Sequence, residues 1–111
     1  MGVKTQETFF STTGETADYA SPSVDTLNKA YSIQLVVEGT YNADAKLQGS
    51  LDGVNWVDID NTEELAFSGD PQTILYDVAV GFHRYARVYI THNSGTFDAK
   101  GFISNGYWQA I

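Results

Sequence analysis

Apolar and polar residues alternate along most of the chain after residue 29, which is the pattern of half-buried β-strands. The clearest run puts four apolar side chains on one face: Tyr31, Ile33, Leu35 and Val37. The same period of two returns in the segments 45–51, 73–80, 84–91 and 97–103. We therefore predict strands in these segments, each with an apolar face toward a common core.

Turn signals separate these runs at intervals of roughly 8 to 12 residues. Asp52 and Gly53 are typical of a hairpin with a type I′ turn, and Asn105 with Gly106 repeats the signal. We expect further turns at residues 39–42, 81–83 and 93–95. The acidic stretch 58–70 is predicted to be mostly loop, with a short strand or a plug for the core at residues 65–67.

Six or seven short strands with no long segment of helical period predict an all-β fold, an antiparallel β-sandwich. Jelly-roll-like and immunoglobulin-like topologies both fit this pattern. Residues 1–29 differ, because they are rich in Thr, Ser, Gly and acidic side chains around one apolar pair, Phe9 and Phe10. We interpret 1–29 as an extended N-terminal arm that adds a strand to its own sheet or to a neighbour's, and 30–111 as the sandwich domain.

Composition argues against several classes of function. The 111 residues carry a net charge of −8, which repels the phosphates that nucleic-acid binding must neutralise. No apolar stretch approaches the roughly 20 residues of a membrane span, and no secretion signal opens the chain, so we expect it in the cytosol unless lysis releases it. The absence of cysteine excludes disulfides, thiolate metal sites and a cysteine nucleophile.

Candidate chemistry is sparse. His83 and His92 lie at opposite ends of one predicted strand, roughly 30 Å apart, so they do not predict a shared metal site. The acids of 58–70 include Asp58, Asp60 and Glu63, but the stretch lacks the glycine and the bidentate glutamate of a calcium loop. A nucleophile elbow and a glycine-rich phosphate loop are also lacking. We expect no enzyme activity, no cofactor and no metal, and we interpret the acids as a solvated loop.

Aromatic residues offer two alternatives. A sugar-stacking platform is one use for Trp56, Tyr85, Tyr89, Tyr107 and Trp108, and core packing or cross-strand pairing is the other. The terminal segment 107–111 is bulky and apolar, so it either closes the sandwich or docks on a partner.

Two motifs resemble those of small phage structural proteins. One is the hairpin sequence of Asp52, Gly53, Asn55 and Trp56, and the other is the strand sequence of Arg84, Tyr85, Arg87 and Val88. A Ser-Gly turn at residues 94–95 then leads into a last strand, and the order matches over about residues 30–103. Length and acidity are also similar to the capsid staple or decoration proteins, also called cement proteins, of short-tailed enterobacterial phages.

This resemblance implies a jelly-roll sandwich on the outside of the virion shell, assembled in the host cytoplasm, that bridges neighbouring major capsid proteins. The expected partners are the major capsid protein and a second copy of the chain, with no nucleic acid and no membrane. Bulky residues of the arm and tail are then the candidate contacts, because aromatic anchors dominate interfaces. They are Phe9, Phe10, Tyr19, Tyr107, Trp108 and Ile111.

The same segments also resemble discoidin domains, in which an Asp-Gly hairpin with a following Trp and an Arg-Tyr strand are structural elements. That resemblance implies a discoidin-like sandwich whose loops contact a sugar or a lipid. Discoidin domains are longer and usually closed by a disulfide, which this chain cannot form. A glycan-binding module of a phage tail or fibre is therefore the alternative function.

Overall fold

The computed structural model describes residues 7–27, 30–68, 72–78 and 83–105, and all regular structure in these residues is β-strand. Among them is no helix long and apolar enough to cross a membrane. The strands are β1 (Glu7–Glu15), β2 (Tyr19–Ala20), β3 (Val24–Asp25), β4 (Tyr31–Ser50), β5 (Val57–Ser68), β6 (Gln72–Val78) and β7 (Tyr85–Asn105).

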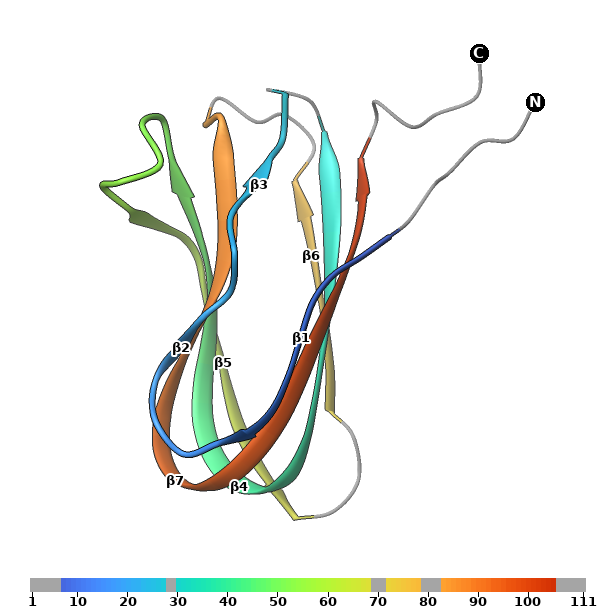
Figure 1. Ribbon diagram of the computed structural model, residues 1–111, viewed down its shortest axis with the longest axis vertical. Helices are drawn as coiled ribbons and strands as arrows, with labels where there is room; N and C mark the ends of the chain where they lie inside the picture. Colours follow the sequence, from blue (N-terminus) through green and yellow to red (C-terminus); the bar gives the residue numbers. More distant parts are fainter. Residues whose placement is uncertain (1–6, 28–29, 69–71, 79–82, 106–111) are drawn as a thin grey trace, which may run out of the picture.

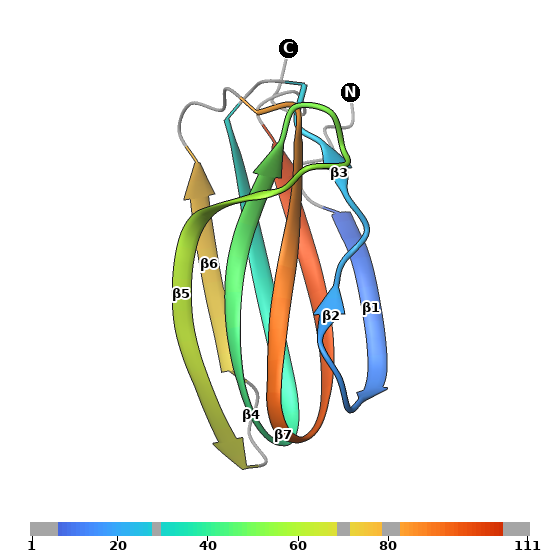
Figure 2. The ribbon, with the colours of Figure 1, turned by 90° about the vertical axis from the view of Figure 1, so that its left-hand side faces the viewer.

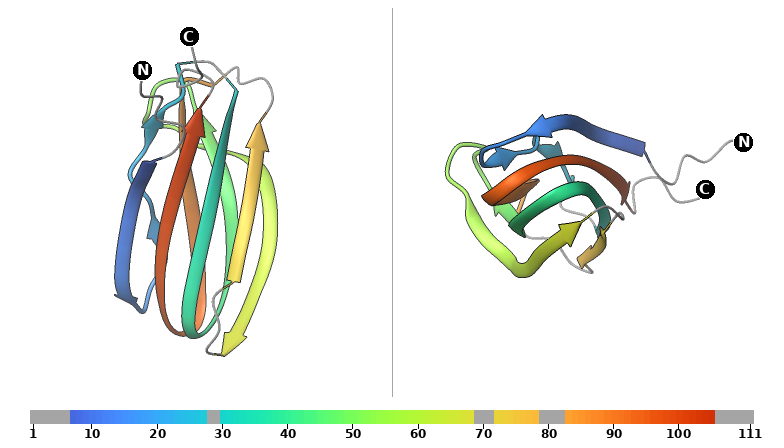
Figure 3. Two further views of the ribbon diagram at one scale, coloured as in Figure 1. Left: turned by 90° about the vertical axis from the view of Figure 1, so that its right-hand side faces the viewer. Right: turned by 90° about the horizontal axis from the view of Figure 1, so that it is seen from below.

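Two very long strands form the centre of the molecule. β4 has 20 residues and β7 has 21, and they pair antiparallel from Tyr31 opposite Asn105 to Ser50 opposite Tyr85. Both strands bend back on themselves at the lower end of the view in Figure 1, so the paired ribbon is folded in half. The two halves of the ribbon lie in opposite layers of a sandwich, which Figure 3 shows from below.

Shorter strands extend each layer at its edges. The first layer consists of β1, the second half of β7, the first half of β4, and β6. The second layer consists of β2 with β3, the first half of β7, the second half of β4, and β5. A long ribbon folded over in this way, flanked by strands on both sides, is the strand order of a jelly roll. The predicted all-β antiparallel sandwich is confirmed.

Two glycines permit the fold-over of the ribbon. Gly39 in β4 and Gly95 in β7 have φ angles of +127° and +82°, which side-chain-bearing residues rarely adopt. A Cβ on Gly95 would lie 2.2 Å from the carbonyl oxygen of Thr40, and a Cβ on Gly39 would lie 2.5 Å from that of Thr96. The two backbones therefore approach each other too closely at the bend for a side chain at either position.

The core lies between the two layers and matches the alternation of the sequence. All four predicted inward residues of the first run are buried, as are those predicted for the start of β7. The buried apolar side chains are Phe10, Tyr31, Ile33, Leu35, Val37, Tyr41, Ala43, Ala45, Leu47, Tyr76, Ala86, Val88, Ile90, Phe97, Ala99 and Ile103.

The structure corrects several local predictions. Residues 39–42 and 93–95 do not end strands, because β4 and β7 bend together and keep their pairing through them. The acidic stretch after Val57 is not mostly loop but the edge strand β5, whose backbone pairs with β4 from Thr40 to Gly49. An antiparallel strand can carry such polar residues because one of its faces is in contact with solvent.

The predicted arm also takes part in the sheets. β1, β2 and β3 all pair with β7, the first with its second half and the other two with its first half. Figure 2 shows them along one side of the sandwich. The chain thus adds this segment to its own sheets.

Candidate binding surfaces

The aromatic residues of the N-terminal segment pack onto the chain itself. Phe10 is 6% exposed, and its ring centroid lies 4.9 Å from that of Phe9 and 5.7 Å from that of Tyr19. A register shift between Thr8 and Phe10 makes Phe9 an extra residue in β1, and both phenylalanine rings lie over Gly101 of β7. Phe10 is therefore a core residue, while Phe9 and Tyr19 are partly buried against the core.

The other half of the predicted contact set falls outside the described residues. Tyr107, Trp108 and Ile111 follow Asn105, where β7 ends. Of the turn predicted at Asn105 and Gly106, Asn105 is the last residue of β7 and Gly106 lies outside the described residues. The predicted roles of these residues remain predictions.

A structured loop joins β4 to β5. The carboxylate of Asp52 accepts hydrogen bonds from the backbone N–H of Val54 and of Asn55, both at 2.8 Å, and from the hydroxyl of Ser50 at 2.9 Å. These bonds, foremost that from the Asn55 backbone, hold the pKa of Asp52 well below its usual range. The expected two-residue hairpin turn is absent. A type I′ turn needs a positive φ at two residues, but in this loop only Gly53 has one, and the loop extends to Trp56.

Four aliphatic side chains project around this loop, and we call them the apolar tip: Leu51, Val54, Val57 and Ile59. Their exposed fractions are 73%, 75%, 69% and 41%. Leu51, Val57 and Ile59 border a hollow of about 430 Å³ whose wall also includes Gly49 and His83, and Val54 lies on the same loop outside that wall. Clustered exposed aliphatic groups of this kind mark interaction sites on soluble proteins.

The sequence pattern placed Leu51 toward the core, and this prediction is wrong, because β4 ends at Ser50 and the loop turns Leu51 outward. The apolar tip is therefore a feature that alternation alone misses. The signal in the sequence that could have indicated it is the pair of apolar residues, Leu51 and Val54, that flank Asp52 and Gly53.

His83 closes one side of the hollow. Its Nε2 lies 2.6 Å from the hydroxyl oxygen of Tyr31, and its backbone carbonyl accepts a hydrogen bond from the hydroxyl of Thr26. Burial lowers the pKa of His83, so the neutral imidazole is favoured at neutral pH. The histidine thus acts as a packed, hydrogen-bonded wall residue.

A second surface lies on the outer face of the second layer, where cationic side chains cover aromatic rings. The Arg87 guanidinium lies 4.3 Å from the ring centroid of Trp56, and the Lys46 ammonium lies 5.4 Å from that of Tyr89. Arg84 lies 5.7 Å from the ring of Tyr85. We call Trp56, Tyr85 and Tyr89 the aromatic row.

Hydrogen bonds fix the polar groups beside the aromatic row. Arg87 donates through Nε to Gln48 at 2.8 Å, and Gln48 donates through Nε2 to Asp58 at 3.0 Å. Lys46 forms an ion pair with the same carboxylate at 3.3 Å. The bond from Gln48, followed by that from Lys46, lowers the pKa of Asp58. Two of the cations over the aromatic row, Arg87 and Lys46, are thus held in one cross-strand network by Gln48 and Asp58.

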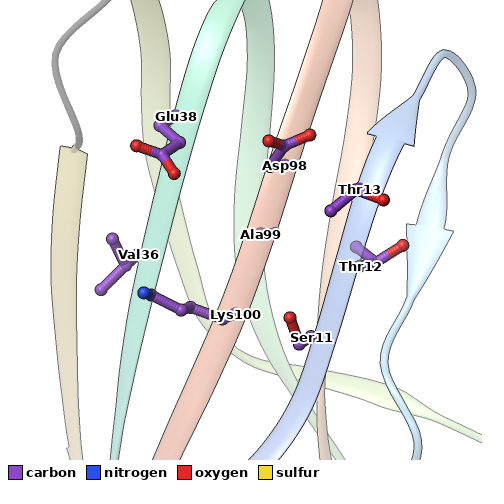
Figure 4. Close-up of a pocket in the computed structure, with 8 residues that line it drawn as sticks. All are labelled: Ser11, Thr12, Thr13, Val36, Glu38, Asp98, Ala99 and Lys100. Atoms are coloured by element: carbon purple, nitrogen blue, oxygen red, sulfur yellow. The ribbon is translucent and has the colours of Figure 1, made fainter.

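A third surface, on the outer face of the first layer, is a small hollow lined mostly by polar residues. Figure 4 shows Glu38, Asp98 and Lys100 around it on neighbouring strands, with three residues of β1 on the other side. Its volume is about 130 Å³, which has room for only a few water molecules. Asp98 also accepts a hydrogen bond from the backbone of Gly14.

The structure brings no metal ligands together among the side chains that it describes. The Nε2 of His92 lies 2.7 Å from the carbonyl oxygen of Gly95. His92 is in the middle part of β7, whereas His83 precedes the start of that strand. Asp58 is engaged by Lys46 and Gln48, and the other acids of the stretch 58–70 lie outside the described side chains.

No protein-family model matches this chain, and no curated protein matches it in sequence. Solved structures share its fold. The SPBc2 prophage-derived protein YomS has a TM-score of 0.56 at 10% identity, over 89% of this chain and 90% of its own. A chain of infectious bursal disease virus, Gx strain, has a TM-score of 0.55 at 11% identity, over 88% of this chain and 30% of its own.

A carbohydrate-binding module has the same fold. It is the C-terminal family 22 module of Clostridium thermocellum Xyn10B, with a TM-score of 0.51 at 10% identity, over 83% of this chain and 66% of its own. At these identities the likeness is one of fold alone. The fold occurs both in proteins of viral or prophage origin and in carbohydrate-binding modules.

Proposed function

We propose that this chain is a structural protein of a bacteriophage virion that binds the outside of the shell and bridges neighbouring major capsid proteins. The phage-like hairpin and strand motifs of the sequence support this proposal. So does the fold shared with a prophage-derived protein and with a chain of a virus.

The observation that carries the proposal is the apolar tip. Its four aliphatic side chains have exposures between 41% and 75%, three of them border one hollow, and Asp52 holds the loop between β4 and β5 in shape. A preformed apolar surface loses little conformational freedom when a partner covers it. Such a surface suits a permanent protein contact, whereas a catalyst needs reactive groups in its cleft.

The test is co-sedimentation of the purified protein with shells that lack it. We expect the wild-type protein to coat these shells and Val54→Asp to bind them at least about tenfold more weakly, because a charge would be buried at the contact. Leu27→Asp is the matched control, since Leu27 is also an exposed aliphatic residue but belongs neither to the apolar tip nor to the wall of the hollow, and its φ of 56° suits Asp. Wild-type binding by Val54→Asp would refute this role of the tip.

Glycan binding is the second candidate, and the aromatic row favours it. Tyrosine and tryptophan rings beside fixed amide, carboxylate and guanidinium groups form the usual surface for sugars. The cations over the three rings compete with sugar stacking. A glycan array with the wild-type protein and with Trp56→Ala tests it: a specific sugar signal that Trp56→Ala abolishes, without shell binding, would replace the virion proposal.

A further inference from the structure

The strands that the structure describes leave four sheet edges, and three of these edges carry features that oppose pairing with another chain. β1 has two register shifts along its contact with β7. β5 has two register shifts against β4 and is rich in acidic residues. β2 and β3 have two residues each, with Pro22 between them. Bulges, charges, proline and short length are the known protections of edge strands.

β6 lacks these protections. Its residues Gln72 to Val78 pair with β4 in one unbroken register, without a bulge or a proline. The strand carries no lysine, and its single charge, Asp77, accepts a hydrogen bond from the hydroxyl of Ser32. Figure 3 shows β6 at the border of the first layer, with only β4 beside it in that sheet.

The outer face of β6 is also apolar at its centre. Leu75 is 63% exposed and stands between Thr73 and Asp77, which are exposed on the same face. A regular strand with an exposed leucine at its midpoint is a template for a further strand.

We propose that β6 binds β6 of a second copy of this chain, antiparallel about a two-fold axis at Leu75. In this register Gln72 lies opposite Val78, Thr73 opposite Asp77, and Ile74 opposite Tyr76. The two exposed Leu75 side chains lie opposite each other and cover one another. The first layers of the two copies then form one continuous sheet.

The sequence of β6 favours its own copy as the occupant. With the axis at residue 75, all seven residues of the strand are paired. Each Asp77 then lies opposite the hydroxyl of Thr73 rather than opposite a like charge. A shift by one residue would turn outer side chains to the inner face. A shift of the axis to Tyr76 would place Leu75 opposite Asp77. The strand is thus self-complementary in one register.

The absence of cysteine makes this register directly testable. Leu75→Cys places two thiols opposite each other, at Cα distances of about 4.5 to 5.5 Å, which is within disulfide range. Thr73→Cys is the matched control, because residue 73 lies opposite 77 and the two new thiols would be about 13 Å apart. We expect mild oxidation to cross-link Leu75→Cys and to leave Thr73→Cys uncross-linked. Equal cross-linking of the two variants, or none of either, would overturn the proposal.

Sedimentation of the uncross-linked protein gives the second readout. At high ionic strength, where repulsion between two chains of charge −8 is screened, we expect the wild-type protein to be a dimer. Leu75→Lys opposes two cations at the axis and should be a monomer, whereas Thr73→Lys faces Asp77 of the other copy and should remain a dimer.

A monomeric wild-type protein, or a monomeric Thr73→Lys with a dimeric Leu75→Lys, would contradict the pairing. If the wild-type protein is monomeric and Leu75→Lys loses shell binding, the edge of β6 pairs with a strand of a capsid protein instead. This result would also overturn the proposal. The inference does not depend on the proposed function. Val54→Asp should dimerise normally, so loss of shell binding and loss of the dimer are distinguishable.

Discussion

Replacement of Gly95 by alanine tests whether the close approach of β4 and β7 stabilises the fold. Two costs are expected. Alanine at a φ of +82° costs about 1 kcal/mol relative to glycine. The new Cβ would also lie 2.2 Å from the oxygen of Thr40 and 2.7 Å from the Cα of Tyr41, which are backbone atoms that no side-chain rotation can move.

Relief of this clash requires the two strands to separate, and Tyr41 and Phe97, whose ring centroids are 6.0 Å apart, would lose part of their packing. Overpacking of this kind costs about 1 to 3 kcal/mol. Gly95→Ala should therefore lower the free energy of unfolding by about 2 to 4 kcal/mol, out of the 5 to 15 kcal/mol typical of a domain.

Gly14→Ala is the matched control for this experiment. Gly14 has a similar φ of +68°, but a Cβ there would meet nothing within 4 Å. It should lower the free energy of unfolding by about 1 kcal/mol, the conformational cost alone. The assay is urea unfolding of both variants followed by fluorescence. Equal losses in the two variants would refute the argument that backbone approach at the bend restricts residue 95 to glycine.

Three other predictions concern single side chains. Ser21→Ala leaves the buried N–H of Val88 without the hydroxyl that accepts its hydrogen bond at 2.9 Å, so unfolding should need about 1 to 3 kcal/mol less, and a loss near zero in urea unfolding would contradict this. Burial lowers the pKa of His83, so the unfolded chain takes up a proton first as pH falls below about 6.5. The wild-type protein should thus lose stability as the pH falls through about 6.5, and His83→Gln, compared by thermal unfolding, should lose less. Asp52→Ala removes the acceptor of the loop amides and should speed hydrogen exchange across 51–55; because hydrogen bonds lower the pKa of Asp52, wild-type protection should persist as pH falls to about 4 and be lost only in stronger acid.

Alternation predicted the buried faces because each long strand has one face on the core. Ile33 and Leu35 in β4, and Val88 and Ile90 in β7, are all fully buried as their spacing indicates. The period of two is a local consequence of strand geometry and needs no knowledge of the partner strand.

The bends could not be predicted in this way. The glycines at positions 39 and 95 are turn signals in the sequence, but each lies where the partner strand bends as well, so the pairing continues instead of ending. Residues 65–67 were predicted as a short strand or a plug, but the rest of β5 was missed because its acidic residues are typical of loops. Its pairing with β4 depends on a neighbour that its own sequence does not reveal.

The candidate contact residues also show that features set by distant parts of the chain escape prediction from the sequence. Phe10 was predicted as a partner contact because it is a bulky residue of the N-terminal segment, but the structure places it in the core, since Gly101 leaves room for its ring. Val54 and Val57 are as apolar as core residues, and only the shape of the loop shows that they are exposed.

The position of β7 at the centre of both layers has a consequence for the order of folding. β1, β2 and β3 pair only with β7, and Glu7 lies opposite Ile103. During synthesis on the ribosome, these first strands have no partner until residues 85–105 emerge, whereas β5 and β6 can pair with β4 earlier. Contacts between such distant residues close slowly, because a long stretch of chain must be ordered first. The strands synthesised first are therefore the last to join the sandwich.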